Sequence, residues 1–457
     1  MRLFDTLLAL SEGGRVPFHM PGHGRSPGFD YLCGAESVDF TEIDGLDNLH
    51  AAEGILKEAM DHAARVWGAD RLFFSVGGST AGMLAAVRAL CRGGKPLLLA
   101  GNAHRSACHA ALLNRSPLHI VRPRLHPLGF ALDVTPEEVE DGLAAFPDTG
   151  AVVVTSPTYD GVVSDIRGIA AVCHARGIPL LTDAAHGAHL GFLDPSVPSP
   201  VSCGADVTVM SMHKTLPALT QTAAVALKGD LADPEEMAAA LAIFETSSPS
   251  YPLMASADGC AYRMEDPALF GGWRKRIARI RDALGSLLPI PEGVFAFDES
   301  KLILRHPSMN GSELAALLRA GNIEPEMTAP DYVLLMTTAV TTEAHADALI
   351  RALASLPRPE PEAFPDIPAP PPSEAVLQPW EADCLPAEEI PAEEAAGRIS
   401  ADFITPYPPG IPLAVPGERI GRDIPAALAL YRSRGCVVLS GRGSIDGTLR
   451  VIKEECL

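Results

Sequence analysis

Between about Ile55 and Leu227, short apolar runs alternate with segments of helical spacing, and this alternation constrains the fold more than any other feature. The runs are RLFFSV, PLLLA, LHIVRP, AVVVT, IPLLTD and DVTVM, and most of them end just before polar residues. Short apolar strands between helices predict a mostly parallel sheet covered by helices. Such sheets bind ligands at the carboxyl ends of their strands. The polar residues that follow the runs are therefore the first candidates for a functional site.

Changes in composition along the chain predict several domains. An N-terminal helix and a large α/β domain are expected over 1–288, and a small α+β domain over 289–356. Residues 357–375 are so rich in proline that they predict an extended linker. A C-terminal domain is expected over 376–457, with a helix over 392–399.

The charge balance excludes some classes of partner. The 457 residues include 36 Lys and Arg against 57 Asp and Glu, a formal net charge of −21, which disfavours binding to nucleic acid. No stretch is apolar for long enough to span a membrane. The nine cysteines form no CxxC pair, so no disulfide framework is expected. We therefore expect a cytoplasmic protein with reduced thiols.

Several polar groups follow the predicted strands. Lys214 comes shortly after DVTVM, Asp183 ends IPLLTD, and His104 follows PLLLA. The segment GGSTAG, from Gly77 to Gly82, lies between a predicted strand and a predicted helix. Backbone amides and hydroxyls at a helix N-terminus are suited to binding a phosphate group.

These are the groups that pyridoxal 5′-phosphate requires. A lysine must bind the aldehyde, a carboxylate must keep the ring nitrogen protonated, a flat side chain should stack on the ring, and an anion cup must hold the phosphate. We assign these roles, in that order, to Lys214, Asp183, His104, and Ser79 with Thr80. Taken singly, each residue has a plainer interpretation, such as a solvated lysine or a helix-capping aspartate. The prediction rests on the four groups occurring together.

Longer motifs resemble those of the Orn/Lys/Arg decarboxylase family in its short bacterial form, which lacks an N-terminal wing domain. The motifs occur in family order and span most of the chain, at 17–24, 39–59, 156–166, 183–192, 211–223, 246–258 and 406–418. The resemblance implies a fold-type I pyridoxal-phosphate enzyme. It also implies removal of the α-carboxylate from arginine, lysine or ornithine, which gives CO2 and a polyamine precursor.

The resemblance adds further expectations about the site. Ser211 and His213 should bind the phosphate, and His186 should touch the cofactor or the substrate carboxylate unless it is only a structural histidine. Lys214 or a neighbouring histidine should return a proton to Cα. A homodimer or higher homo-oligomer is expected, in which the loop 246–252 meets the phosphate of the neighbouring subunit.

Three residues are candidates for substrate contact. Thr158 and Asp160 follow another strand, although Asp160 could instead shape the turn before Gly161. Glu418 provides a carboxylate that could attract the cationic substrate, although it could also be solvated or cap a helix.

Other functions stay open at this point. An aminotransferase or a carbon–sulfur lyase would use the same cofactor. Asp183, His186 and His189 follow D-x2-H-x2-H spacing, and His19 with His23 follows H-x3-H spacing, so a metallohydrolase is a second alternative. A catalytically silent homologue is a third. We expect no metal at the site.

Overall fold

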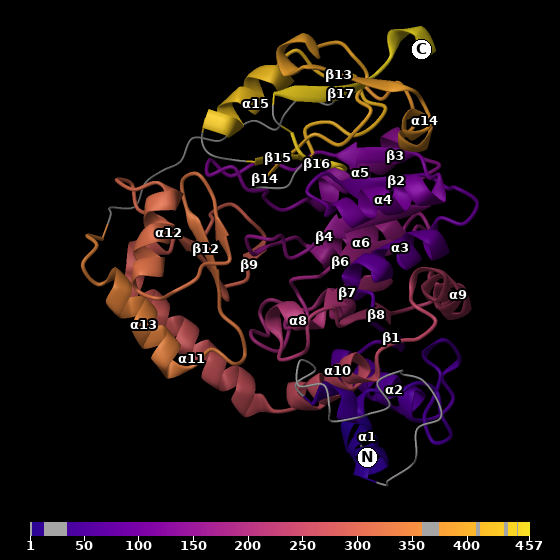
Figure 1. The fold of residues 1–457 in the computed structure, drawn as a ribbon, viewed down its shortest axis with the longest axis vertical. Helices are drawn as coiled ribbons and strands as arrows, with labels where there is room; N and C mark the ends of the chain where they lie inside the picture. The colour runs from indigo at the N-terminus through magenta and orange to yellow at the C-terminus, as the bar shows by residue number, and fades with distance from the viewer. Residues whose placement is uncertain (1, 13–33, 359–373, 408–411, 434–436, 446) are drawn as a thin grey trace.

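The computed structural model describes residues 2–12, 34–358, 374–407, 412–433, 437–445 and 447–457. His19, His23 and the motif at 17–24 lie outside the described residues. The first described helix, α1 (Leu3–Glu12), forms where the N-terminal helix was predicted. A seven-stranded sheet lies at the centre of the molecule (Figure 1).

The central sheet has the strand order β1-β8-β7-β6-β4-β2-β3. Strand β8 pairs antiparallel with both of its neighbours, and the remaining pairs are parallel. This confirms the predicted mostly parallel sheet. Its strands are β1 (Arg71–Ser75), β2 (Leu97–Ala100), β3 (Leu118–Val121), β4 (Ala151–Thr155), β6 (Leu180–Asp183), β7 (Val207–Ser211) and β8 (Ala223–Leu227).

Helices cover both faces of this sheet because its strands are apolar on both sides. Leu97 and Leu99 face one helical layer, whereas Leu98 and Ala100 face the other. The first layer consists of α3 (Gly78–Leu90), α4 (Arg105–Asn114) and α9 (Pro234–Phe244). The second contains α2 (Ile55–Trp67), α5 (Pro136–Ala145), α6 (Ile166–His174) and α10 (Tyr251–Met264).

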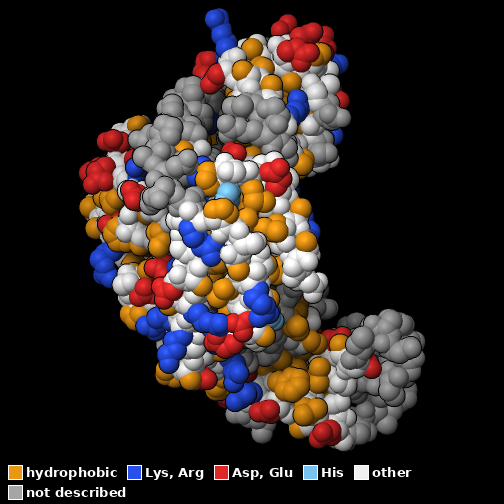
Figure 2. Space-filling model, turned by 90° about the vertical axis from the view of Figure 1, so that its left-hand side faces the viewer, with side chains coloured by type: hydrophobic (Ala, Val, Ile, Leu, Met, Phe, Trp, Pro, Cys, Tyr) orange, Lys and Arg blue, Asp and Glu red, His pale blue; other side chains and the backbone are white. Residues whose placement is uncertain are grey.

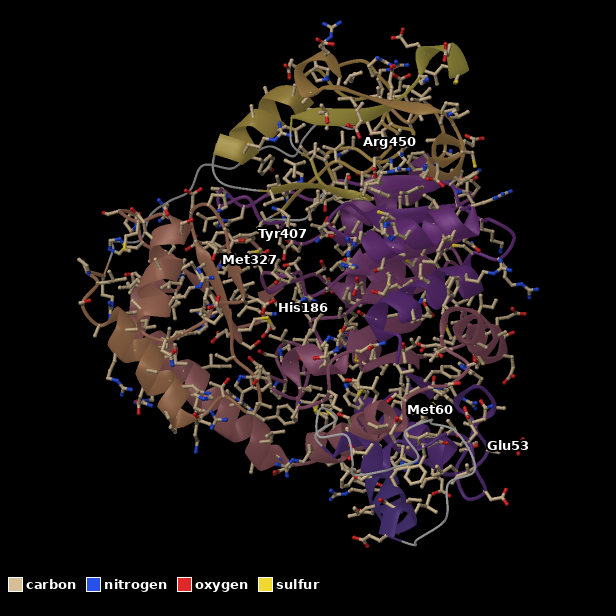
Figure 3. All side chains as sticks on the ribbon, viewed as in Figure 1. Glu53, Met60, His186, Met327, Tyr407 and Arg450 are labelled. Atoms are coloured by element: carbon tan, nitrogen blue, oxygen red, sulfur yellow. The ribbon has the colours of Figure 1, made fainter. Side chains whose placement is uncertain are left out.

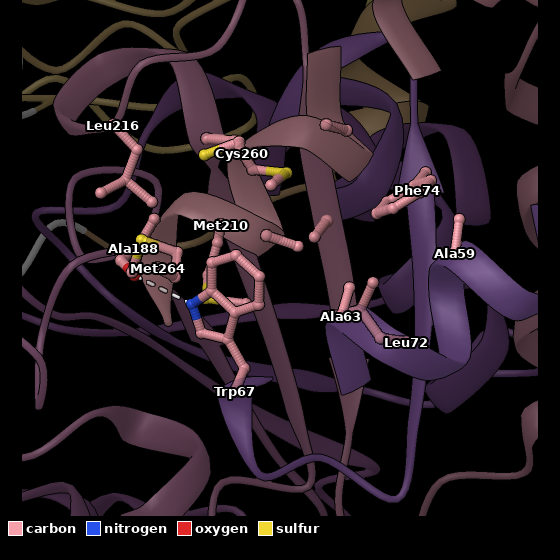
Figure 4. Close-up of a cluster of buried hydrophobic side chains, with 14 of the residues drawn as sticks. Ala59, Ala63, Trp67, Leu72, Phe74, Ala188, Met210, Leu216, Cys260 and Met264 are labelled. Atoms are coloured by element: carbon pink, nitrogen blue, oxygen red, sulfur yellow. Dashed lines mark hydrogen bonds between the residues drawn. The ribbon is translucent and has the colours of Figure 1, made fainter. Parts of the chain in front are cut away.

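A buried cluster around Trp67 supports the segments that follow β6 and β7 (Figure 4). The Trp67 indole N–H donates to the carbonyl of Ala188 at 2.9 Å, and both Met210 and Leu216 belong to the same cluster. Burial of a large aromatic side chain contributes a few kcal/mol. The cluster therefore holds the backbone on either side of the candidate site.

A smaller antiparallel sheet has the order β10-β12-β11. One face packs on three helices, and the other face packs on the central part of the molecule through a cluster that includes Phe130 and Phe297. Strands β5 and β9 pair with each other beside this contact. These elements are β5 (Val162–Val163), β9 (Ala296–Phe297), β10 (Lys301–Leu304), β11 (Met327–Thr328), β12 (Val333–Met336), α11 (Pro267–Leu284), α12 (Gly311–Ala320) and α13 (Glu343–Leu353).

The C-terminal residues form two small sheets, of which β13-β17 lies above β2 and β3 in Figure 1 and β14-β15-β16 lies to their left. Phe403 joins the core cluster of α4, with its ring 5.6 Å from that of His109. The elements are α14 (Pro379–Asp383), β13 (Ala387–Pro391), β14 (Thr405–Tyr407), α15 (Ile424–Ser433), β15 (Val437–Ser440), β16 (Gly443–Ser444) and β17 (Thr448–Ile452).

The helix predicted over 392–399 is wrong beyond its first turn. Only Ala392–Glu394 is helical, as a 3-10 turn. Gly397 then adopts a φ of 86°, which a right-handed helix does not allow, and Ile399 forms a β-bridge with Arg419. Tertiary pairing overrides the helical preference of this segment.

On the face that carries α11 and α13, acidic and basic side chains are intermingled (Figure 2). Arg279 of α11 pairs with Glu343 of α13 at 2.9 Å and also with Asp347. Within the described residues, no helix combines the length and the apolar character needed to cross a membrane.

Candidate active site

Lys214 and Asp183 lie at the same edge of the central sheet, because β6 and β7 are parallel neighbours. Asp183 is the last residue of β6, and Lys214 lies in the short helix α8 (Met212–Thr215) directly after β7. Burial lowers the pKa of Lys214, and the negative charge of Asp183 opposes this effect. Asp183 is itself buried, and its Oδ1 accepts the backbone N–H of Ala185 at 3.0 Å. The structure thus brings together the predicted amine and carboxylate.

His104 lies close enough to sense both groups. It is the N-cap of α4, and its Nδ1 accepts the backbone N–H of Ser106 at 3.2 Å. Desolvation lowers the pKa of His104, whereas the charge of Asp183 raises it and that of Lys214 lowers it further. The residue is exposed, so it is accessible to a ligand.

The predicted anion cup lies at the N-terminus of α3. This helix has no side-chain N-cap, so the N–H groups of its first turn are available to a ligand. Ser211 donates its hydroxyl hydrogen to Ser79 Oγ at 2.9 Å, and Thr80 is exposed at the same helix end. The His213 ring contacts the carbonyl of Thr222 through Nδ1 at 2.9 Å. This donor set fits a phosphate group.

One neighbour of the cup was not predicted. The carboxylate of Glu245 accepts the backbone N–H of Gly77 at 2.9 Å and also the hydroxyl of Ser75. The Gly77 amide is therefore already engaged, which leaves the later amides of α3 and the hydroxyls for an anion.

His186 lies between two lysines, at the junction of the central and the small sheets (Figure 3). Its Nε2 is 3.2 Å from Nζ of Lys214, and its Nδ1 is 2.9 Å from Nζ of Lys301. Burial, together with the charges of both lysines, holds the pKa of His186 well below its usual range. The ring is therefore neutral at physiological pH. The edge of the ring packs against Tyr159, with centroids 4.8 Å apart.

His189 and His186 have different partners, contrary to what a shared metal would need. His189 Nε2 lies 3.1 Å from the carboxylate of Asp298, and its Nδ1 lies 3.1 Å from the hydroxyl of Thr215. Among the residues that the structure describes, no cluster of His, Cys, Asp and Glu is arranged to hold a metal ion. His186 therefore connects Lys214 with Lys301, whereas His189 connects Thr215 with Asp298.

Thr158 and Asp160 shape the turn after β4. Thr158 Oγ1 accepts the backbone N–H of Val162 at 3.0 Å, and Asp160 Oδ1 accepts the hydroxyl hydrogen of Tyr332 at 2.6 Å. Burial raises the pKa of Asp160 to about 6. These contacts fit the alternative in which Asp160 shapes the turn before Gly161. Within the described chain, no hydrogen bond joins Thr158 or Asp160 to Lys214.

Glu418 is not brought together with this cluster. Its Oε2 accepts the backbone N–H of Val415 at 3.0 Å, and its Oε1 lies 3.6 Å from Arg122. The residue is buried where the C-terminal segment meets the end of β3. Its predicted contact with substrate gains no support from this position.

Sequence reasoning missed Lys301 and Glu326, which both reach the site from the small sheet. Lys301 opens the apolar run KLILRHP and is fully buried, which is rare for lysine. Glu326 is exposed, and its charge raises the pKa of both Lys214 and Lys301 against the lowering effect of burial. The sequence holds no motif signal for either residue, because their roles depend on how the small sheet packs.

Comparison with known families gives two matches along the chain. The Orn/Lys/Arg decarboxylase major domain matches residues 2–286, and the C-terminal domain of the same family matches residues 370–432. An arginine decarboxylase from Bacillus subtilis is 32% identical, over 96% of this chain and 95% of that protein. An arginine decarboxylase from Bacillus anthracis is also 32% identical, over 99% of this chain and 97% of that protein.

Solved structures show the same fold at lower identity. The Francisella novicida lysine decarboxylase LdcF superposes with a TM-score of 0.83 at 18% identity, over 99% of this chain and 81% of that chain. A serine palmitoyltransferase from S. paucimobilis, solved with bound PLP, superposes with a TM-score of 0.53 at 15% identity, over 72% of this chain and 83% of that chain. The predicted fold class is therefore confirmed.

Proposed function

Because the chain belongs to the Orn/Lys/Arg decarboxylase family, it decarboxylates a basic amino acid, and we propose that this amino acid is arginine and that pyridoxal 5′-phosphate is held at Lys214. The choice of arginine is supported by relatives named arginine decarboxylase at 30–32% identity over nearly the whole chain. The observation that carries the site is the cluster of half-buried Lys214 with buried Asp183 and His186 at the carboxyl edge of β6 and β7.

The residues present fit this cofactor. Lys214 has a lowered pKa, so its amine is more readily available to bind an aldehyde carbon than an ordinary lysine. Ser79, Thr80 and Ser211 surround an uncapped helix N-terminus that suits the phosphate. When bound, pyridoxal 5′-phosphate supplies a ring that accepts the electron pair of the broken bond between Cα and the carboxylate.

Four side chains have distinct roles around that ring and its phosphate. Asp183 is buried and negatively charged, so it favours a proton on a ring nitrogen that lies beside it. His104 offers an exposed face for stacking. His186, held neutral by burial, presents Nε2 to Lys214 and so helps to orient the amine that leaves and returns during turnover. His213 lies next to Lys214 in α8 and is the second histidine that we propose for the phosphate end.

We propose Glu326 as the residue that recognises the cationic end of the substrate. A carboxylate can accept two N–H groups of a guanidinium side by side. Glu326 Oε1 accepts the hydroxyl hydrogen of Tyr159 at 2.5 Å, and the ring of Tyr159 packs on His186. Glu326 is thus tied to the same cluster as Lys214 while its carboxylate stays exposed. We propose that Thr158 and Asp160 stabilise the turn that carries Tyr159. We propose that Glu418 stabilises the C-terminal segment through its contact with Val415.

Further proposals concern the oligomeric state, the location and the domain division of the protein. We propose a cytoplasmic homodimer or higher oligomer that acts in polyamine biosynthesis. We also propose that the chain divides into a large domain over 1–288, a small domain over 289–356, a linker over 357–375 and a C-terminal domain over 376–457. A fully active monomer, observed by sedimentation at assay concentration, would contradict the proposed oligomer.

The direct test is incubation of the purified chain with pyridoxal 5′-phosphate and, separately, arginine, lysine and ornithine, followed by chromatography of the products. We expect CO2 and the amine derived from arginine in larger amounts than either other amine. Formation of a keto acid would favour an aminotransferase, and a preference for lysine or ornithine would overturn the proposed substrate.

A further inference from the structure

Lys301 is a fully buried lysine with a defined partner. Its relative exposure is 0%, and its Nζ lies 2.9 Å from Nδ1 of His186. A buried ammonium group costs several kcal/mol unless neighbours compensate for the lost hydration. Gly161 leaves the necessary room, since a Cβ at that position would come within 2.8 Å of Lys301 Cγ. Because complete burial of this lysine is costly, we looked for a function of its contact with His186.

The contact with His186 limits which nitrogen of the imidazole ring can carry the proton. A neutral imidazole has one N–H and one lone pair. His186 has a lysine at each nitrogen, so it accepts a hydrogen bond from one lysine and donates its own N–H toward the other. The two lysines therefore cannot both donate to this ring.

A second bridge ties the same turn to the helix that bears Lys214. The backbone N–H of Lys301 donates to the carbonyl of Asp298 at 3.0 Å, so the two residues belong to one turn. Asp298 contacts His189 at 3.1 Å, and His189 in turn contacts Thr215, the neighbour of Lys214. The turn at 298–301 thus reaches Lys214 from two sides.

We propose that Lys301 is a positioning residue: it donates to Nδ1 of His186, fixes the Nε2–H tautomer, and so keeps the Lys214 amine neutral and nucleophilic. With the proton on Nε2, His186 donates to the nitrogen lone pair of Lys214 and disfavours the ammonium form. The inference rests on the proposed role of Lys214 and adds the device that prepares it.

The charges around Lys301 allow it to act as the donor. Burial disfavours the ammonium form of Lys301, whereas the carboxylates of Asp298, Glu326 and Asp160 favour it. The resulting pKa of Lys301 is about 8, so the side chain is still mostly protonated at neutral pH. The other facing groups are His186, which burial holds neutral, and His189, which binds Asp298.

The tautomer can be read in the parent protein. The full chain, labelled with ¹⁵N-histidine and free of cofactor, is measured by long-range ¹H–¹⁵N correlation at pH 7, and His186→Gln assigns the ring signals. We expect a protonated Nε2 and an unprotonated Nδ1. The reverse tautomer would overturn the proposal, and this measurement does not depend on the folding of any variant at Lys301.

The effect on Lys214 is measured by competitive acetylation of the full chain across pH, with peptide mass spectrometry. In Lys301→Met, His186 is free to offer a lone pair to the Lys214 ammonium, so the midpoint of Lys214 labelling should rise by about one pH unit. Labelling below the midpoint should then fall about tenfold. Lys301→Arg retains a charged donor and should keep the parent midpoint. Lys228→Met removes an exposed lysine that pairs with Asp70 and serves as the control.

An unchanged midpoint in folded Lys301→Met would show that Lys301 is only structural, and a shift in Lys301→Arg as large as in Lys301→Met would overturn the role of the donor. Neither measurement uses substrate or turnover. Failure of this inference is therefore distinguishable from failure of the proposed function.

Discussion

The amine of Lys301 lies 2.9 Å from Nδ1 of His186, although the two residues are 115 positions apart and belong to different parts of the fold. His186 follows a strand of the central sheet, whereas Lys301 opens β10 of the small sheet. The contact makes the small sheet a structural part of the site around Lys214. Changes in how the two sheets pack should therefore alter the chemistry of Lys214.

Asp183→Asn should retain the shape of the site but lose the negative charge that favours a protonated ring nitrogen. The side-chain oxygen of Asn can still accept the N–H of Ala185. We expect turnover to fall on the order of 100-fold or more, as for loss of other preorganised electrostatic groups, while the protein still binds pyridoxal 5′-phosphate. Steady-state kinetics and the visible spectrum of the variant test this together. Unaltered turnover would remove Asp183 from the mechanism.

Glu326→Gln should weaken recognition of the substrate cation. We expect KM for arginine to rise by about tenfold or more, equivalent to about 1.4 kcal/mol or more, with a smaller change in cofactor binding. Glu324→Gln is the matched control, because Glu324 is an exposed carboxylate two positions away that pairs with Arg319 at 2.7 Å. Similar KM values for both variants and the parent would show that Glu326 does not bind substrate.

Lys301→Met should change the pH dependence of stability with a predictable sign. Burial lowers the pKa of Lys301 to about 8 from the ordinary value of 10.5. Below pH 8 the Lys301 ammonium group is present in both the folded and the unfolded protein, so the free-energy cost of burying it is fully present. As pH rises from 8 toward 10.5, the folded protein releases this proton before the unfolded chain does, so the penalty disappears.

The free energy of unfolding of Lys301→Met, relative to the parent, should therefore be most favourable below pH 8. That difference should decrease by about 2 kcal/mol between pH 7 and pH 9.5. Chemical denaturation at several pH values measures it. A difference that stays constant across this range would contradict the lowered pKa.

The central sheet and the positions of several candidate site residues were predictable from local sequence. Each strand is an apolar run, and the carboxyl ends of neighbouring parallel strands lie together, so Asp183 and Lys214 could be assigned to one edge. Ser79 and Thr80 could be placed at a helix N-terminus because they follow a strand and begin a helical segment.

The remaining parts depend on tertiary packing. Lys301 occurs at the start of an apolar strand, and only the docking of the small sheet brings it to His186. Glu418 was expected near the substrate, yet the packing of its loop turns it toward Val415 and Arg122. The helical preference of 392–399 was outweighed by pairing with other segments. His186 and Arg122, which contact Lys301 and Glu418, are both remote from these residues in sequence.

The most direct test of this account is to reduce the protein with borohydride in the presence of pyridoxal 5′-phosphate and to map the modified peptide by mass spectrometry. Reduction fixes the cofactor on the lysine that holds it. We predict that the phosphopyridoxyl group is found on Lys214 and that Lys214→Ala yields neither this modification nor amine product. Modification of Lys301 in the parent, or full turnover by Lys214→Ala, would contradict the account.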